Sequence, residues 1–245
     1  MAYEILTQWI QEANHIVFFG GAGVSTECGI PDFRSEKGIY RIRNKYGISP
    51  EEILSHSFFM EHPATFYEYY RENMLFPDAK PSMAHKTLAY MESIGKLDCV
   101  ITQNIDALHQ EAGSKRVYEL HGSVKRNYCM RCKQFYPMET ILESDKIPTC
   151  PKCHGLIKPD VVLYEEPLDE QVFNGSLHAI LRADLMIVGG TSLNVYPAAG
   201  LLQYFQGNHL VLINLSKTPY DSMADLVIHE KIGTVMSAIY ENLQG

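Results

Sequence analysis

Six apolar runs of strand length recur along this 245-residue chain, and helix-length segments separate them. Apolar runs that alternate with helices are typical of a parallel sheet buried between two helical layers. The runs cover residues 15–19, 98–102, 116–120, 184–190, 209–215 and 225–229. The sequence therefore predicts an α/β fold with a Rossmann-like parallel sheet and helices on both of its faces.

Small or polar residues follow five of the six runs. Ligands of such sheets bind at the carboxyl ends of the strands, so we expect these segments to converge on one site. They read GAGVS (21–25), TQNID (102–106), ELHGS (119–123), GGTS (189–192) and NLS (214–216). The carboxyl edge of the sheet is therefore where we expect the functional site.

The first of these segments belongs to GGAGVSTECGIPDFR, residues 20–34, which joins a turn of small residues to a charged loop. Backbone N–H groups in a turn between a strand and a helix can bind a phosphate. Gly21 and Gly23 match the first two glycines of a dinucleotide-binding fingerprint, whereas Thr26 occupies the place of the third. The turn alone therefore leaves open both nucleotide binding and a plain tight turn before a helix.

Two segments interrupt the alternation and predict a smaller second domain. Residues 38–77 are rich in aromatic side chains and helical in pattern, and Ser49 before Pro50 is typical of a helix start. Residues 125–158 contain four cysteines and show little periodicity. We therefore expect a Rossmann-like domain made of residues 1–37, 78–124 and 159–245, and a small domain made of residues 38–77 and 125–158.

The four cysteines form two C-x2-C pairs, Cys129 with Cys132 and Cys150 with Cys153, and 17 residues lie between the pairs. This spacing is typical of a structural zinc site, in which four thiolates complete a tetrahedron and leave no place for water. A redox dithiol and two disulfides are the alternatives, but a redox motif would need only one pair. We predict one structural zinc ion.

The composition argues against several classes of protein. A formal net charge of −8 is unlike that of a general nucleic-acid binder, which would be basic. No apolar run approaches the roughly 20 residues that a transmembrane helix needs. Leu6 and Ile10 lie at helical spacing near the N-terminus, which indicates an amphipathic helix rather than a secretory signal. We expect a cytoplasmic protein with reduced cysteines and with neither a membrane nor a nucleic acid as partner.

Two of the polar segments carry side chains suited to sugar binding or to catalysis. Gln103, Asn104 and Asp106 follow one strand, and amides with a carboxylate can bind ribose hydroxyls and a carboxamide. Asn104 or Asp106 could equally cap a helix. His121 follows another strand and could act as a base near neutral pH, although a single histidine is more often structural. The residues alone therefore do not decide between ligand binding and helix capping for Asn104 and Asp106, or between a catalytic and a structural role for His121.

Taken together, the motifs resemble one family. GAGVSTECGIPDFR, TQNIDALH, ELHGS, the paired C-x2-C motifs, GTSLNVYPA and NLS occur in the order found in sirtuins of the bacterial type, which are NAD-dependent protein-lysine deacylases. The resemblance covers essentially the whole chain. It implies that NAD binds to Gly21, Ala22, Gly23, Ser25, Thr26, Asp32, Phe33, Arg34, Gln103, Asn104, Ile105, Asp106, His121, Gly190, Thr191, Ser192, Asn214, Leu215 and Ile232.

The resemblance also implies the chemistry. His121 would be the catalytic base and Asn104 a second catalytic residue, while Cys129, Cys132, Cys150 and Cys153 would hold the structural zinc. NAD would be consumed as a co-substrate, because nicotinamide leaves and the acyl group of the lysine moves to ADP-ribose. A mono-ADP-ribosyltransferase and a non-catalytic NAD-sensing module are the alternatives. An intact His121 favours deacylation over both.

The substrate side departs from the family in one place, and it lacks a motif found in one group of its members. An acyl-lysine protein or peptide would bind as an added strand to residues 158–166, where Tyr164-Glu165-Glu166 replaces a common Phe-Gly-Glu. The lost glycine puts the flexibility of this loop in doubt. Members that take charged acyl groups carry Tyr-x-x-Arg, but Tyr70 stands in the third place after Tyr67, and Arg71 comes one residue late. The resemblance therefore implies a preference for uncharged acyl groups.

Overall fold

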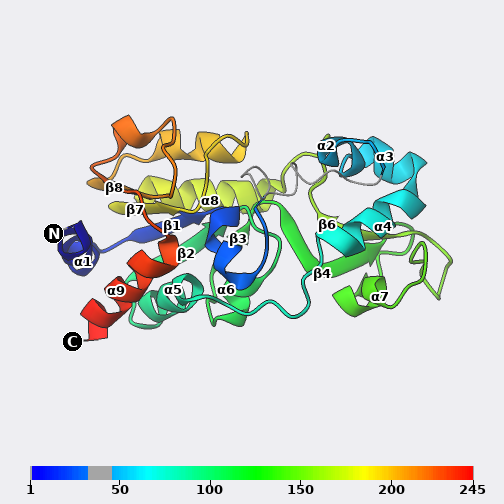
Figure 1. Ribbon diagram of the computed structural model, residues 1–245, viewed down its shortest axis with the longest axis horizontal. Helices are drawn as coiled ribbons and strands as arrows, with labels where there is room; N and C mark the ends of the chain where they lie inside the picture. The colour runs from blue at the N-terminus through cyan, green and yellow to red at the C-terminus, as the bar shows by residue number, and fades with distance from the viewer. Residues whose placement is uncertain (1, 33–45, 245) are drawn as a thin grey trace.

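All six predicted strands form one parallel sheet in the computed structural model, which describes residues 2–32 and 46–244 (Figure 1). The strand order is β3-β2-β1-β7-β8-β9, and every neighbouring pair is parallel. The strands are β1 (Ile16–Gly20), β2 (Leu97–Thr102), β3 (Val117–Glu119), β7 (Leu185–Gly189), β8 (His209–Ile213) and β9 (Leu226–Ile228). The predicted fold class is confirmed.

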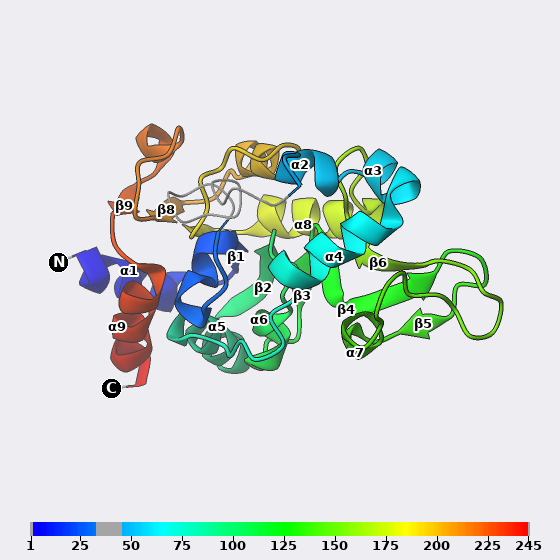
Figure 2. The same cartoon turned by 45° about the vertical axis from the view of Figure 1, so that its right-hand side comes forward.

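Helices cover both faces of this sheet. Successive residues of β1 show the division, because Phe18 packs into the core on one face and Phe19 into the core on the other. The first core is completed by α1 (Ala2–Glu12), α5 (Met83–Ser93) and α9 (Ile232–Gln244). The second is completed by α8 (Glu170–Arg182) and η4 (Ala198–Tyr204). Figures 1 and 2 show α5 and α9 side by side, as their contacts require.

A second, antiparallel sheet with the strand order β5-β4-β6 lies to the right of the main sheet in Figure 1. Its strands are β4 (Gly122–Cys129), β5 (Phe135–Tyr136) and β6 (Ile157–Val161). Beside it lie α2 (Pro50–Ile53), α3 (His56–Glu61), α4 (Pro63–Asn73) and α7 (Met138–Leu142). Ser49 caps α2 as predicted, since its hydroxyl accepts a hydrogen bond from the Glu52 amide at 3.1 Å.

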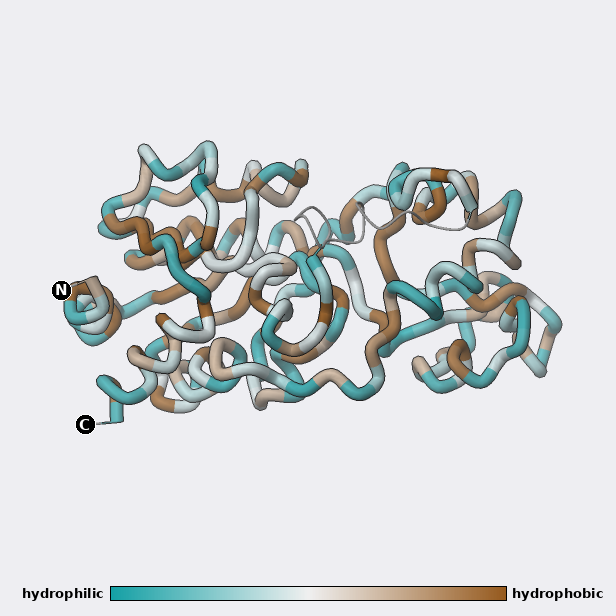
Figure 3. The backbone as a smooth tube through the Cα atoms, in the orientation of Figure 1, coloured by the Kyte–Doolittle hydropathy of each residue, from teal (hydrophilic) through white to brown (hydrophobic). Residues whose placement is uncertain are grey.

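One further apolar core joins these helices to the small sheet. It contains Phe66, Tyr67 and Tyr70 of α4 together with Ile157 of β6, all at 0% exposure. The Tyr67 hydroxyl donates to the Ile157 carbonyl. Figure 3 shows hydrophobic segments in the strands of the main sheet and, separately, in this second region. Among the residues that the structure describes, no helix has both the length and the apolar character needed to cross a membrane.

Two buried histidines, one on α5 and one on α6 (Leu108–Glu111), pack against each other. His85 of α5 and His109 of α6 are 0% and 1% exposed, and their ring centroids are 4.6 Å apart. His85 Nδ1 accepts the Ser82 amide at 3.2 Å and lies 3.9 Å from Cys28 Sγ. Burial lowers the pKa of His85 to about 4 and also lowers that of His109. Both rings are therefore neutral in the folded protein at neutral pH.

This pair predicts loss of stability in mild acid. In the unfolded chain these histidines take up protons below about pH 6.5, whereas His85 in the folded protein does so only near pH 4. Since the unfolded state then binds more protons than the folded state, the free energy of unfolding falls as the pH drops between these values. Urea unfolding at about pH 7.5 and about pH 5 should differ by roughly 2 kcal/mol from His85 alone. A His109→Phe variant should show a smaller pH dependence than the wild type, and an equal dependence would contradict this explanation.

Candidate functional site

The loops that follow β1 and β7 pack backbone against backbone. The Gly23 amide donates to the Gly190 carbonyl at 2.7 Å, and the Gly21 amide donates to the Gly189 carbonyl at 3.2 Å. A Cβ atom on Gly23 would lie 2.7 Å from Gly190 Cα, and Gly190 has a left-handed φ of +60°. These glycines are therefore needed for the close approach of the two loops, a role that a fingerprint within one turn does not indicate.

The prediction of a regular helix directly after the glycine turn is wrong. Two short 3-10 helices, η1 (Ala22–Val24) and η2 (Thr26–Cys28), stand there instead. Gly29, with a φ of +83°, ends η2. The Glu27 carboxylate accepts a hydrogen bond from the Gly233 amide at 2.9 Å, in the first turn of α9. This contact between distant parts of the sequence holds the loop against α9, and no local pattern could have predicted it.

Polar side chains from two strand ends form a chain of hydrogen bonds. Asn104 Nδ2 donates to Ser25 Oγ at 3.0 Å, and the Ser25 hydroxyl donates to Asp106 Oδ2 at 2.6 Å. The Thr102 hydroxyl accepts a hydrogen bond from the backbone amide of Asn104 at 3.0 Å. Asn104 and Ser25 are both buried. The loops after β1 and β2 are thus fixed to each other by the residues that the sequence singled out.

Asp106 lies beside a cavity. Its other carboxylate oxygen accepts from the Leu108 amide at 2.9 Å, and the cavity is lined by Asp106, Leu108, Ile30 and Val124, among others. Burial raises the pKa of Asp106, while the hydrogen bonds from Ser25 and Leu108 lower it in part. Asp106 thus places a half-buried carboxylate next to apolar side chains in the segment after β2.

His121 is held in the tautomer that a general base needs. Its Nδ1 lies 2.9 Å from the Gln103 carbonyl, which can only accept, so Nδ1 carries the proton and Nε2 keeps its lone pair. Burial lowers the pKa of His121, and the hydrogen bond to Gln103 offsets part of that shift. The imidazole is therefore neutral at pH 7 and able to take up a proton at Nε2.

The remaining predicted residues take different positions. Gln103 Nε2 donates to Thr191 Oγ1 at 3.2 Å, which joins the strand ends of β2 and β7. Asn214 follows β8, and its side chain donates to the Ser216 carbonyl at 2.8 Å. Ile232 is only 4% exposed and belongs to the core. Thr26, Ser192 and Leu215 are exposed, Ala22, Ile105 and Asp32 are half-buried, and Phe33 and Arg34 lie outside the described residues.

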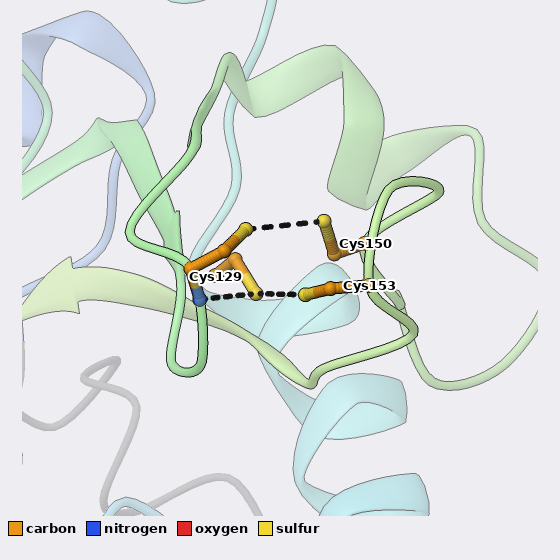
Figure 4. A group of neighbouring side chains, drawn as sticks. Cys129, Cys150 and Cys153 are labelled. Atoms are coloured by element: carbon orange, nitrogen blue, oxygen red, sulfur yellow. Dashed lines mark hydrogen bonds between the residues drawn. The ribbon is translucent and has the colours of Figure 1, made fainter.

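The four predicted zinc ligands converge on one point. Figure 4 shows the sulfur atoms of Cys129, Cys150 and Cys153 pointing toward one another. The Sγ atoms of all four cysteines, Cys132 included, lie within 4.8 Å of one another. The Cys129–Cys153 and Cys132–Cys150 sulfur distances are 3.4 Å and 3.6 Å. A disulfide would need about 2.05 Å. These cysteines are therefore not disulfide-bonded.

The cluster fits zinc. A tetrahedral ion with Zn–S bonds of about 2.3 Å places its sulfurs roughly 3.8 Å apart. The Tyr136 hydroxyl lies 3.0 Å from Cys150 Sγ and can donate to a thiolate. A Cβ atom on Gly155 would come within 2.9 Å of Cys129 Sγ, so glycine keeps this space clear. His154, which could compete as a ligand, is exposed and is not part of the cluster.

The segment after β6 runs between the site and α3. The Val162 amide donates to the His121 carbonyl, and the Tyr164 amide donates to the Leu54 carbonyl, both at 3.0 Å. The His56 amide donates in turn to the Tyr164 carbonyl at 3.0 Å. Residues 162–164 thus connect the backbone of His121 to the start of α3. They lie within residues 158–166, which the sequence predicts to bind the substrate.

A model of the Sir2 family matches residues 21–197 of the chain. This chain belongs to the Sir2 family. Its relatives include a protein of Clostridium acetobutylicum, 57% identical over 96% of both chains, and one of Clostridium perfringens, 55% identical over 96% of this chain and 97% of the relative. Both relatives are named NAD-dependent protein deacetylase.

Solved Sir2 structures are also similar to this chain. One, of Sir2 with a p53 peptide and NAD⁺, superimposes with a TM-score of 0.88 at 39% identity and covers 100% of this chain and 99% of its own. Another, of Sir2 bound to acetylated peptide, has a TM-score of 0.87 at 37% identity, with coverage of 100% and 99%. The Sir2 fold therefore extends over the whole chain described here, small sheet and cysteine cluster included.

Proposed function

We propose that this protein is an NAD-dependent protein-lysine deacetylase. The observation that carries the proposal is the position of His121, a neutral base whose ring is bound to Gln103 and whose carbonyl is bound to Val162. It thus lies between the polar strand ends and the predicted substrate segment. The names of the relatives and the ligands of the solved Sir2 structures support this assignment.

NAD would lie along the carboxyl edge of the main sheet. The loops holding Gly21, Ala22, Gly23 and Ser25 would surround its pyrophosphate, and Asp106 with Ile105 would receive the nicotinamide amide. Asn104 and Gln103 would contact the nicotinamide ribose, while Thr191, Ser192 and Asn214 would hold the adenosine half. The hydrogen bonds among Asn104, Ser25 and Asp106 support a preformed pocket at this point.

The reaction would transfer the acyl group to ADP-ribose. The carbonyl oxygen of the acyl-lysine attacks C1′ of the nicotinamide ribose, and the bond from C1′ to nicotinamide breaks. His121 Nε2 then takes the proton of a ribose hydroxyl, which attacks the imidate carbon. Addition of water releases free lysine and O-acyl-ADP-ribose. The neutral state of His121, which its burial favours, supports its role as the base.

Mass spectrometry of an acetyl-lysine peptide incubated with the protein and NAD tests this function. We expect the peptide to lose its acetyl group, with nicotinamide and O-acetyl-ADP-ribose as co-products. Added ADP-ribose on a protein or peptide would instead indicate a mono-ADP-ribosyltransferase. An unchanged peptide together with intact NAD would refute the proposal.

We propose that uncharged acyl groups are preferred, because Arg71, the arginine one place beyond the Tyr-x-x-Arg position, is already engaged. Arg71 Nε donates to the Ile141 carbonyl and its Nη2 to Ser144 Oγ, both at 2.8 Å, and Nη2 also donates to the Lys146 carbonyl. Tyr70 lies on α4 as expected but is fully buried against Phe66, with ring centroids 5.4 Å apart. A Tyr70→Arg substitution would therefore place a charge in the core of the small domain.

Matched acetyl-lysine and succinyl-lysine peptides test this preference. A succinyl carboxylate without a cation to pair with would lose several kcal/mol on burial, so kcat/KM for the acetyl peptide should be roughly 100-fold higher or more. An Arg71→Gln variant should leave this ratio unchanged even if it lowers stability. Equal rates on both peptides, or a ratio that depends on Arg71, would contradict the proposal.

We also propose the division into two domains at the boundaries stated above, residues 38–77 and 125–158 forming the small one. The separate apolar core that joins α4 to the small sheet supports it. Zinc bound to the four cysteines would join the connection between β4 and β5 to the segment that precedes β6. The site has no open position for catalysis, since four thiolates complete the coordination of the ion.

A further inference from the structure

Glu165 adopts a backbone conformation that favours glycine. Its φ is +76°, in the left-handed region that residues with a Cβ atom rarely enter. The residue lies in the predicted substrate segment, directly after Tyr164, whose backbone is bound to Leu54 and His56. A glycine would be the expected residue here, so the presence of glutamate calls for a contact that compensates for the strain.

The Glu165 side chain makes such a contact. Its Oε2 accepts hydrogen bonds from both the amide and the hydroxyl of Ser57, at 2.9 Å and 2.7 Å. Ser57 lies in the first turn of α3. The two donors come from one residue, and both reach the same oxygen of Glu165. The carboxylate therefore fastens the substrate segment to α3 from the side chain, in addition to the backbone bonds of Tyr164.

The next residue fastens the same segment through a second set of contacts. Glu166 accepts hydrogen bonds from His56 Nδ1 at 2.8 Å, from Lys158 Nζ at 3.0 Å and from the Leu163 amide at 2.9 Å. Two successive carboxylates thus bind to α3, to β6 and to the segment itself. Residues 162–166 are held by side chains as well as by backbone, which differs from a flexible glycine loop.

We propose that Glu165 is a positioning residue, which holds residues 162–166 in the conformation that binds the substrate peptide by bonding to Ser57. The proposal rests on the function proposed above and adds to it a residue that touches α3 rather than the reacting atoms. A peptide that binds as an added strand pairs with the backbone of this segment. A segment that is already ordered in the free protein loses less conformational entropy when the peptide binds. Glu165 supplies that order where a glycine would not.

Substitutions at both partners test the proposal. Glu165→Ala and Glu165→Gly remove the acceptor, and we expect each to raise KM and Kd for an acetyl-lysine peptide roughly fivefold, with kcat within about twofold of the wild type. Glu165→Gln keeps an oxygen that can accept from Ser57 and should stay close to the wild type. Glu61→Ala removes an exposed carboxylate from the end of α3 and is the matched control.

Hydrogen exchange of the free protein gives a readout that does not depend on activity. In Glu165→Ala and Glu165→Gly the amides of residues 162–166 should exchange faster than in the wild type, whereas Glu165→Gln and Glu61→Ala should not change them. An active protein in which Glu165→Ala leaves Kd and exchange unchanged would overturn the proposal. A Glu165→Gln variant as impaired as Glu165→Ala would also overturn it, since charge alone would then matter. Lack of NAD-dependent deacetylation by the wild type would refute the function itself.

Discussion

Replacing His121 with alanine is expected to lower kcat/KM for NAD-dependent deacetylation by roughly 10²- to 10⁴-fold, the contribution typical of a positioned general base. The half-buried imidazole is neutral, and its tautomer is fixed by the Gln103 carbonyl. Alanine removes the only group that we assign to proton removal, while the backbone bond from Val162 to residue 121 can persist. Peptide binding and the free energy of unfolding should therefore change little.

Steady-state kinetics on an acetyl-lysine peptide, together with urea unfolding, measure both effects. His15→Ala is the matched control, because His15 precedes β1 at the opposite edge of the sheet and pairs with Asp98 at 2.9 Å. A His121→Ala protein that keeps more than about a tenth of the activity would remove this residue from the mechanism. A variant that unfolds would be tested again as His121→Asn.

Loss of one zinc ligand is expected to disrupt the small domain. Structural zinc contributes on the order of 10 kcal/mol in small zinc-binding domains, and three thiolates leave the ion open to water and chelators. Cys132→Ala should therefore release zinc to a chelator that the wild type resists, and should lower both the unfolding midpoint and the activity. Cys99→Ala, outside the cluster and 1% exposed, controls for loss of a buried thiol.

Metal analysis of protein purified without chelators gives the stoichiometry. We expect one zinc per chain in the wild type and in Cys99→Ala, and less than one in Cys132→Ala. A wild-type protein without zinc, or one that keeps its small domain folded after the metal is removed, would contradict a structural role. Activity is affected only indirectly, since the cluster lies in the small sheet and not at the strand ends that hold His121.

The central strands β1, β7 and β8 could be predicted from the sequence because they are buried almost throughout. Each reads as a nearly continuous apolar run, whereas the edge strand β3 is half-buried and short. The cysteine cluster was predictable for a similar reason, since its ligands occur in short local pairs. The start of α2 followed from Ser49 and Pro50 alone.

Contacts between distant segments could not be predicted in this way. Gly23 lies close to Gly190 in another loop, a contact that the sequence of the turn does not indicate. Glu27 binds the Gly233 amide, and no local pattern relates the two. At Glu165 the sequence indicated a missing glycine, whereas the structure keeps the glycine-like backbone and compensates through Ser57. Local patterns report which face is buried, and they do not report which loops meet.

His121 makes two hydrogen bonds, one through its ring and one through its backbone carbonyl, to different parts of the chain. Its ring reaches the Gln103 carbonyl on the side predicted to bind NAD, and its own carbonyl accepts from Val162 in the segment predicted to bind the peptide. We therefore expect a peptide that shifts residue 162 to shift also the ring that we propose to face the ribose. Such coupling between two ligands is reciprocal at equilibrium, so the factor by which peptide changes the affinity for NAD must equal the factor by which NAD changes the affinity for peptide.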